Sequence, residues 1–310
     1  MPRMPAPPLL LHSLTEFRTL ILSCLEAAEA HTVLEIGSES GVFTRELLSF
    51  AATREGKVLC VEPYPTLELE QLAATEPRFH LIAGRSPEAL EGVEPCAAYI
   101  IDGDHNYWTV SRELEHALGG REATRAPLVV LHDVSWPSGR RDQYYAPDAL
   151  PPGAVHPHSW DHGSRPGIED AVRGGMRGNG SFAIALKEGG ERNGVRTAVE
   201  DFVAARDDLR FVYVPSIFGV GFVYSRSAPY AEALAALLDS LDGNPLLERL
   251  ERNRVDLYMK VIELQDAASD TGLRQGRLIA EYDRSLTAAE AEAAGLRIQV
   301  AELRENATTS

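Results

Sequence analysis

The stretch Val33-Leu34-Glu35-Ile36-Gly37-Ser38-Glu39-Ser40-Gly41 decides the fold of this chain. An apolar run with one acidic residue is followed by two glycines, which predicts a buried strand, a tight turn and the start of a helix. Glycine has no Cβ and tolerates positive φ, so a ligand can approach the bare backbone of such a turn. In an α/β sheet this place commonly holds a nucleotide-like cofactor. Because position 39 is Glu, the stretch does not fit the Gly-x-Gly-x-x-Gly pattern of dinucleotide-binding proteins.

Short apolar runs alternate with helical patterns on both sides of this stretch. The runs are 32–36, 57–61, 79–83, 97–101 and 128–131, and the helical patterns are 14–30, 42–53, 66–75, 86–91 and 107–118. This alternation predicts an α/β fold, a parallel sheet with helices on both faces. A helical pattern at 193–206 precedes two strand patterns, 209–214 and 217–225, which we expect to pair antiparallel at the end of the sheet.

The composition is that of a soluble globular protein. The chain has 310 residues, 44% of them apolar and 25% charged, enough for one large core or two modest ones. A formal net charge of −16 argues against nucleic acid and anionic membranes as partners. The prolines in residues 1–12 exclude a secretion signal, and no run of about 18 apolar residues could span a bilayer. The three cysteines are too few for a disulfide framework, so we expect a cytoplasmic protein.

The chain divides into two predicted parts. We expect a domain over 1–228, interrupted at 134–181 by an insertion rich in Pro, Gly, Arg and aromatic residues. A loop of that length is usually functional or disordered, and here it would form a lid over the site at the ends of the strands. Residues 229–310 carry helical patterns at 230–242, 245–268 and 273–305. They predict a helical hairpin or an intermolecular coiled coil, and a solvated tail is the alternative.

The glycine turn resembles the first motif of class I S-adenosylmethionine (SAM) dependent methyltransferases, acidic-x-Gly-x-x-x-Gly. An acid about 20 positions further on, Glu62, could accept both hydrogen bonds of a ribose diol. An exposed strand-end charge is the alternative for Glu62, and Glu35 could pair with the ligand's ammonium group or brace the turn. The resemblance implies SAM as cofactor and a binding site made of Glu35, Gly37, Ser38, Gly41, Glu62, Gly84, Ser86 and Asp102.

Acidic residues and histidines follow the fourth and fifth runs. The fourth is followed by Asp102-Gly103-Asp104-His105-Asn106, and the fifth ends in His132-Asp133. The ends of adjacent parallel strands meet at one edge of a sheet, so these groups should converge. Carboxylates suit Mg²⁺ or Mn²⁺, and imidazole extends the range toward Fe²⁺ or Zn²⁺. A helix-capping neighbourhood for His105 and a backbone-bonded His132 are the alternatives without chemistry.

Asp-Gly-x-His after strand four with a pair ending in Asp after strand five resembles the metal-dependent O-methyltransferases of macrolide sugars and related bacterial natural products. The resemblance covers residues 30–225 and implies a Rossmann-like, seven-stranded, mostly parallel sheet. The helical patterns after residue 228 add a C-terminal helical appendage. The resemblance also implies Mg²⁺ or another divalent metal at Asp102 and Asp133, with Asp102 and His105 catalytic and His105 as general base. The sequence departs from this family at His132, where the sugar enzymes have an acid, so His132 joins the candidate metal ligands.

The insertion supplies the candidate acceptor contacts. Aromatic rings could stack on the acceptor and arginines could hold an acidic group on it. The candidates are Trp136, Arg140, Arg141, Tyr144 and Tyr145.

We therefore expect SAM-dependent methyl transfer to a hydroxyl of a small molecule, a sugar or natural product, by a homodimer joined through C-terminal helices. The alternatives are an N- or carboxyl-methyltransferase without metal, a metal-dependent hydroxylase, and a non-catalytic partner subunit.

Overall fold

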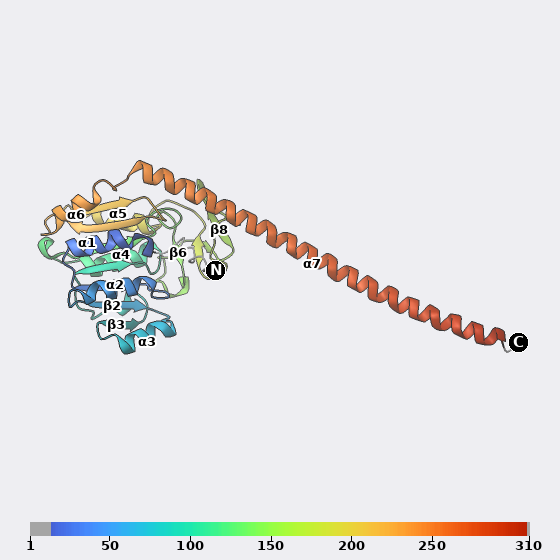
Figure 1. The fold of residues 1–310 in the computed structure, drawn as a ribbon. Helices are drawn as coiled ribbons and strands as arrows, with labels where there is room; N and C mark the ends of the chain where they lie inside the picture. Colours follow the sequence, from blue (N-terminus) through green and yellow to red (C-terminus); the bar gives the residue numbers. More distant parts are fainter. Residues whose placement is uncertain (1–13, 309–310) are drawn as a thin grey trace, which may run out of the picture. The chain divides into compact units, whose positions relative to one another are not determined.

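Seven strands form the central sheet of the computed structural model, which describes residues 14–308 (Figure 1). Their order is β3-β2-β1-β4-β5-β12-β11. The strands are β1 (Thr32–Ile36), β2 (Lys57–Glu62), β3 (Phe79–Ala83), β4 (Ala98–Ile101), β5 (Leu128–His132), β11 (Leu209–Val214) and β12 (Val220–Ser225). Strands β1 to β5 pair in parallel, and β12 runs antiparallel to both β5 and β11. The prediction of a mostly parallel, seven-stranded α/β sheet is confirmed. The proline-bearing residues 1–12 lie outside the described residues.

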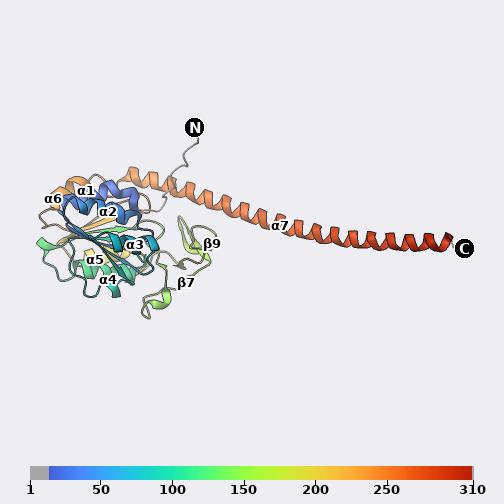
Figure 2. The ribbon, with the colours of Figure 1, turned by 60° about the horizontal axis from the view of Figure 1, so that its bottom comes forward.

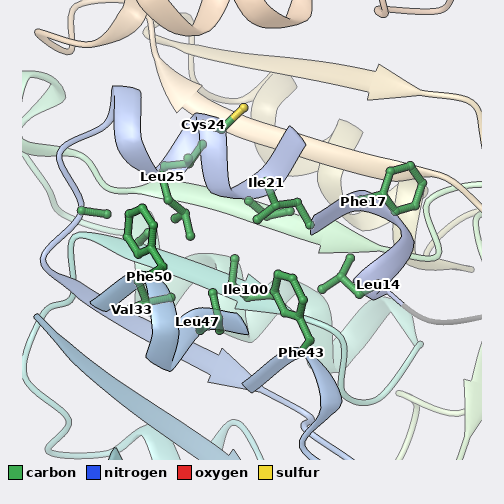
Figure 3. Close-up of a cluster of buried hydrophobic side chains, with 14 of the residues drawn as sticks. Leu14, Phe17, Ile21, Cys24, Leu25, Val33, Phe43, Leu47, Phe50 and Ile100 are labelled. Carbon is green, nitrogen blue, oxygen red and sulfur yellow. The ribbon is translucent and has the colours of Figure 1, made fainter. Parts of the chain in front are cut away.

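Helices cover both faces of the sheet, because successive strand residues point to opposite sides. Val33 packs in the core beside the helices α1 and α2, and the next residue, Leu34, packs in the core beside α4 and α5. Figure 2 shows α1, α2 and α6 on one side of the sheet and α4 and α5 on the other. Figure 3 shows the first core, where Ile21 and Leu25 of α1 face Leu47 of α2. The helices are η1 (Leu14–Phe17), α1 (Arg18–Ala27), α2 (Val42–Ala52), α3 (Leu67–Thr75), η2 (Glu88–Leu90), α4 (Tyr107–Leu118), η3 (Ala123–Arg125), η4 (Pro147–Ala149) and α5 (Val195–Ala204).

The insertion is ordered as two small sheets. Strands β6, β10 and β7 form one of them, and β8 pairs with β9 in the other. The strands are β6 (Gln143–Tyr144), β7 (His158–Ser159), β8 (His162–Arg165), β9 (Ile168–Arg173) and β10 (Ala183–Ala185). Most of these strands are too short for a two-residue period to emerge in the sequence, which is why strands β6 to β9 were not predicted. The amide of Gln143 donates to the carbonyl of His105, which ties the insertion to the loop after β4.

The C-terminal part differs from its prediction in two respects. Helix α6 (Ala231–Leu238) is buried against the first core, and buried Val255 and Met259 extend the compact unit to Met259 instead of residue 228. Helix α7 (Pro245–Thr308) is one continuous helix, so the predicted hairpin is wrong. The isolated Gly272 costs a helix only about 1 kcal/mol and does not end it. None of the helices within residues 14–308 combines the length and apolar character that crossing a membrane needs.

Candidate active site

The glycine turn after β1 brings the first strand against the loop after β4. Gly37 has φ +81°, and a Cβ there would collide with the backbone oxygen of Asp102. Gly41, with φ +72°, is the N-cap of α2. Both positions need a left-handed backbone that side chains rarely tolerate, so the glycine spacing follows from the geometry of this turn.

Glu62 holds the turn from the end of β2. Its carboxylate accepts hydrogen bonds from the amides of Ser38, Glu39 and Tyr64, each at 3.1 Å. A carboxylate offers about four lone-pair sites, so these three bonds leave one of them, on Oε1. The predicted contact with both ribose hydroxyls would need two. The three amides give Glu62 a structural role, and its contact with a ribose diol stays a prediction.

Glu35 lies beneath the turn and is almost fully buried. The hydroxyl of Thr44 on α2 donates to its carboxyl group at 2.6 Å. Burial raises the pKa of Glu35 to about 8 despite this hydrogen bond, so the group is mostly protonated at neutral pH. Of the two roles predicted for Glu35, these contacts match bracing the turn.

The end of β3 places Gly84 and Ser86 at the same edge of the sheet. The Ser86 hydroxyl donates to Glu113, a fully buried residue of α4 that the sequence analysis did not identify. Burial raises the pKa of Glu113 to about 8. Gly84 is half-buried, and the nearest atom to a Cβ placed there would be the Cβ of Ala89, at 3.0 Å.

Two carboxylates and two imidazoles meet at the ends of β4 and β5. His105 Nε2 lies 3.1 Å from Asp133 Oδ2 and 3.4 Å from Asp102 Oδ1. His132 Nδ1 lies 3.1 Å from the same Asp102 oxygen, and its Nε2 lies 3.1 Å from the carbonyl of Ile217. Among the described residues, Asp102, His105 and Asp133 can hold a metal ion, with donor atoms within 4.8 Å of one another.

The ring of His132 is also held by the backbone carbonyl of Ile217, in agreement with the alternative prediction of a backbone-bonded histidine. Its Nδ1 lies 3.6 Å from Asp133 Oδ2, so it borders the metal-capable cluster without belonging to it. Asn106 beside His105 caps α4 by accepting from the amide of Thr109. Capping and chemistry therefore coexist in this loop.

The carboxylates hold both imidazoles in their charged form. Burial alone lowers the pKa of His105, but Asp133 and Asp102 outweigh it and raise the value to about 9. For His132, burial also lowers the pKa, and Asp102 and Asp133 raise it to about 9. Burial raises the pKa of Asp102, but the charges and hydrogen bonds of His132 and His105 together outweigh it and lower the value. His132 Nε2 faces a carbonyl and Nδ1 a carboxylate, an arrangement that only the doubly protonated ring satisfies.

The orientation of Asp133 depends on a loop that follows β11. Asp133 has φ +57°, and the next two amides, of Val134 and Ser135, donate to the carbonyls of Gly219 and Phe218. That loop is itself left-handed at Ile217, Phe218 and Gly219, and the two oxygens of Glu251 accept from the amides of Ile217 and Phe218 at 2.9 Å. Glu251 on α7 thus supports the backbone that holds both His132 and Asp133.

The candidate acceptor residues have diverse environments. Tyr145 is half exposed, and its ring centroid lies 6.3 Å from that of His105. Trp136 is half-buried beside Phe218. Tyr144 is fully buried and donates to Asp142 at 2.8 Å, inside the insertion.

Both arginines are paired within the protein, Arg140 at the surface, where its side chain is 41% exposed, and Arg141 in the interior. Arg140 donates to Glu200 of α5 at 2.6 Å. Arg141 is fully buried and donates to the carbonyls of Ala185 and Glu169. The structure thus brings Tyr145 to the cluster, whereas Arg141 has no exposed surface for an acceptor.

The sequence analysis also missed Asp142, which joins the insertion to α4 and α5. Its carboxylate accepts from the amides of Tyr107 at 2.8 Å and Gly194 at 2.6 Å. Asp142, Glu113 and Glu251 all act on partners at least 27 residues away, and no local pattern marks such pairs.

Residues 34–134 match the family model of a methyltransferase domain. No curated protein matches the chain. Among solved structures, the chain is similar to an O-methyltransferase from Bacillus cereus in complex with SAH (15% identity, 69% of this chain and 81% of that chain, TM-score 0.42). It is also similar to the O-methyltransferase TomG from Streptomyces achromogenes, involved in tomaymycin synthesis, in complex with SAM (16%, 69% and 80%, TM-score 0.39). A third is the SAH-bound methyltransferase PaMTH1 from Podospora anserina (14%, 69% and 80%, TM-score 0.42).

Proposed function

We propose that this chain is a class I SAM-dependent methyltransferase that methylates a hydroxyl group of a small molecule with the help of a divalent cation. Its mostly parallel, seven-stranded sheet and the methyltransferase domain matched over residues 34–134 support the first part of the proposal. One observation carries the proposal. The carboxylates of Asp102 and Asp133 and the imidazole of His105 converge within 4.8 Å at the ends of β4 and β5. The turn at Gly37 packs against the backbone of Asp102, so the cofactor side and this cluster are neighbours.

The donor set fits a divalent cation. Two carboxylates supply the oxygen ligands that Mg²⁺ and Mn²⁺ prefer, and an imidazole is compatible with Mn²⁺. The two imidazolium charges show that this pocket already balances positive charge against Asp102 and Asp133. In the proposal Asp102 and Asp133 hold the cation, with His132 bracing Asp102. A bound divalent cation lowers the pKa of a hydroxyl that it contacts, as it does for water.

His105 is the proposed general base. Its Nδ1 is buried without a hydrogen bond to any described residue, so its Nε2 is the nitrogen directed at the cluster. With a cation bound, Asp102 and Asp133 would share their charge with it and would hold the proton on His105 less tightly. Neutral His105 then accepts the hydroxyl proton while the acceptor oxygen bonds to the methyl carbon of SAM and the sulfonium leaves as a thioether. A general base of this kind contributes about 10²–10⁴ in rate.

The surroundings favour a ring-bearing small acceptor, such as a sugar or a natural product. Tyr145 stands half exposed beside His105, and Phe182 lies 6.0 Å from it between ring centroids. Aromatic faces of this kind stack on planar or sugar rings. The described cysteines Cys24, Cys60 and Cys96 are buried free thiols, which suits the reducing cytoplasm that we propose as its compartment.

Two binding measurements on the full chain test the proposal. We expect calorimetry to show SAH binding, and Mn²⁺ titration followed by electron paramagnetic resonance to show one bound ion per chain. Asp133→Asn should weaken Mn²⁺ affinity at least about tenfold, because loss of even a residue that only supports a metal ligand typically lowers the affinity by that factor. SAH affinity should stay the same.

Asp148→Asn in the insertion, where the side chain is exposed, is the matched control and should leave both affinities unchanged. Normal Mn²⁺ affinity in Asp133→Asn would overturn the cation site, and failure to bind SAH would overturn the cofactor assignment.

A further inference from the structure

Helix α7 carries apolar side chains that no other described residue covers. From Lys260 to Val300 nearly every side chain of the helix is solvent-exposed. The exposed apolar residues include Leu264 (61%), Leu278 (53%), Leu296 (54%) and Leu303 (69%). Most helical stability in proteins comes from packing an apolar face and not from helix propensity alone. An unpartnered helix of this length therefore needs a partner for that face.

Most of the exposed apolar residues follow a seven-residue repeat in two blocks, and Leu273 and Ile298 lie outside it. The positions conventionally named a and d, three and four residues apart, form the seam of a coiled coil. In the first block, a is Val261, Ala268 and Gln275, and d is Leu264, Thr271 and Leu278. In the second block, a is Ile279, Leu286, Ala293 and Val300, and d is Tyr282, Ala289, Leu296 and Leu303.

Tyr282 joins the two blocks, since it would be the next a position of the first block and is the first d position of the second. The change of register amounts to an insertion of four residues. Such an insertion locally unwinds a coiled coil without breaking it. One seam can therefore run from Val261 to Leu303.

The kinds of side chain in this seam select the assembly. Every β-branched aliphatic residue of the seam, Val261, Ile279 and Val300, lies at an a position. Leucine fills d at Leu264, Leu278, Leu296 and Leu303. β-Branched residues at a with Leu at d favour parallel, two-stranded coiled coils.

Charge complementarity agrees with the parallel arrangement. In a parallel, in-register pair, position g of one heptad faces position e of the following heptad in the partner. Here Glu292 occupies g and Arg297 occupies e, and both are exposed. Opposite charges at these positions set the orientation of the partner helix. In one helix the two residues are five positions apart and do not face each other.

We propose that residues 261–303 form a parallel, in-register, two-stranded coiled coil with a second copy of this chain, so that the enzyme is a homodimer. The proposal rests on the helix alone and is independent of the methylated group.

The mass of the full chain in solution is the first test. We expect sedimentation equilibrium at micromolar concentration to give twice the chain mass of 33.9 kDa. The double variant Leu296→Glu, Leu303→Glu places charge in the seam and should halve the mass. Ile298→Glu is the matched control, because Ile298 is equally exposed at 61% but lies on the outer face of the repeat, and it should stay dimeric. A monomeric or higher-order wild type, or a double variant that stays dimeric, would overturn the proposal.

Cysteine crosslinking tests the orientation. The native cysteines are buried, so they provide no crosslink background. Leu264→Cys and Leu296→Cys, made separately, should each form an intermolecular disulfide under mild oxidation, whereas Ile298→Cys should not. An antiparallel pair brings at most one of the two seam positions next to its own copy. Crosslinking at only one position, or equally at Ile298→Cys, would contradict the parallel register.

Discussion

Raising the pH should destabilise the metal-free protein through His105. The pKa of this imidazole is about 9 in the folded chain, against an ordinary value of 6.5. A raised folded-state pKa gives stability that is fully present below pH 6.5 and is lost as the pH rises through about 9. At about 1.4 kcal/mol per pKa unit, the difference corresponds to about 3 kcal/mol. The side chain of His105 is only 12% exposed, so solvent screening reduces this value little.

Thermal unfolding in the presence of EDTA, from pH 6 to pH 9.5, measures this loss. For a compact unit of this size, about 3 kcal/mol corresponds to a fall in Tm of about 6–12 °C. His132, Glu35 and Glu113 also have raised pKa values and contribute with the same sign, His132 up to about pH 9 and the two carboxyl groups mostly below pH 8, so the total fall in Tm exceeds the share of His105. The His105→Gln variant retains those contributions, so the difference between the two pH profiles isolates His105.

His80→Gln is the matched control, since His80 is exposed on β3, and its profile should match that of the wild type. The reasoning is refuted if the wild type and His105→Gln lose stability in parallel between pH 6.5 and 9. A wild type that gains stability over this range would refute it as well.

Three further substitutions probe the turn, the supporting loop and the acceptor side. Gly37→Ala should cost more than about 3 kcal/mol and abolish SAH binding in calorimetry, because left-handed strain of about 1–2 kcal/mol adds to a backbone collision. Gly167→Ala, at φ +74° but with open space around it, should lose only the stability that the left-handed strain costs. Equal losses of stability in the two variants would count against the collision. Glu251→Gln should lose about 1–3 kcal/mol in denaturant unfolding and weaken Mn²⁺ binding, because one buried amide loses its acceptor. Exposed Glu248→Gln should change neither, and a Glu251 variant that behaves the same way would contradict the supporting role. Tyr145→Ala should raise the KM for the acceptor and leave the KM for SAM unchanged, and the reverse pattern would move Tyr145 to the cofactor side.

The regular part of the fold could be predicted because each strand is an apolar run with a turn at its end. The predicted runs 32–36 and 79–83 coincide with β1 and β3. The last strand was predicted to begin at 217 but begins at Val220, because Ile217 and Phe218 adopt left-handed backbone. Both have high strand propensity, so their conformation depends on hydrogen bonds from distant residues, those of their amides to Glu251 above all.

The site was partly predictable for the same reason. Parallel topology places whatever follows β4 and β5 at one edge, which is why Asp102, His105 and Asp133 could be expected to meet. Local sequence does not reveal which polar side chains are already engaged. Arg141 looks like an acceptor ligand in the sequence but is buried under backbone carbonyls, and Glu113 becomes part of the site only through folding.

Methyl transfer itself tests the central claim most directly. The measurement is the transfer of radiolabelled methyl from SAM to a panel of catechol, phenol and sugar-hydroxyl acceptors, with amines and carboxylic acids in parallel. We predict labelled methyl ethers, loss of turnover with EDTA, recovery with Mg²⁺ or Mn²⁺, and a fall of about 10²–10⁴ in kcat for His105→Gln. Turnover that persists in EDTA and in Asp133→Asn, or label found only on nitrogen or carboxylate, would contradict the account.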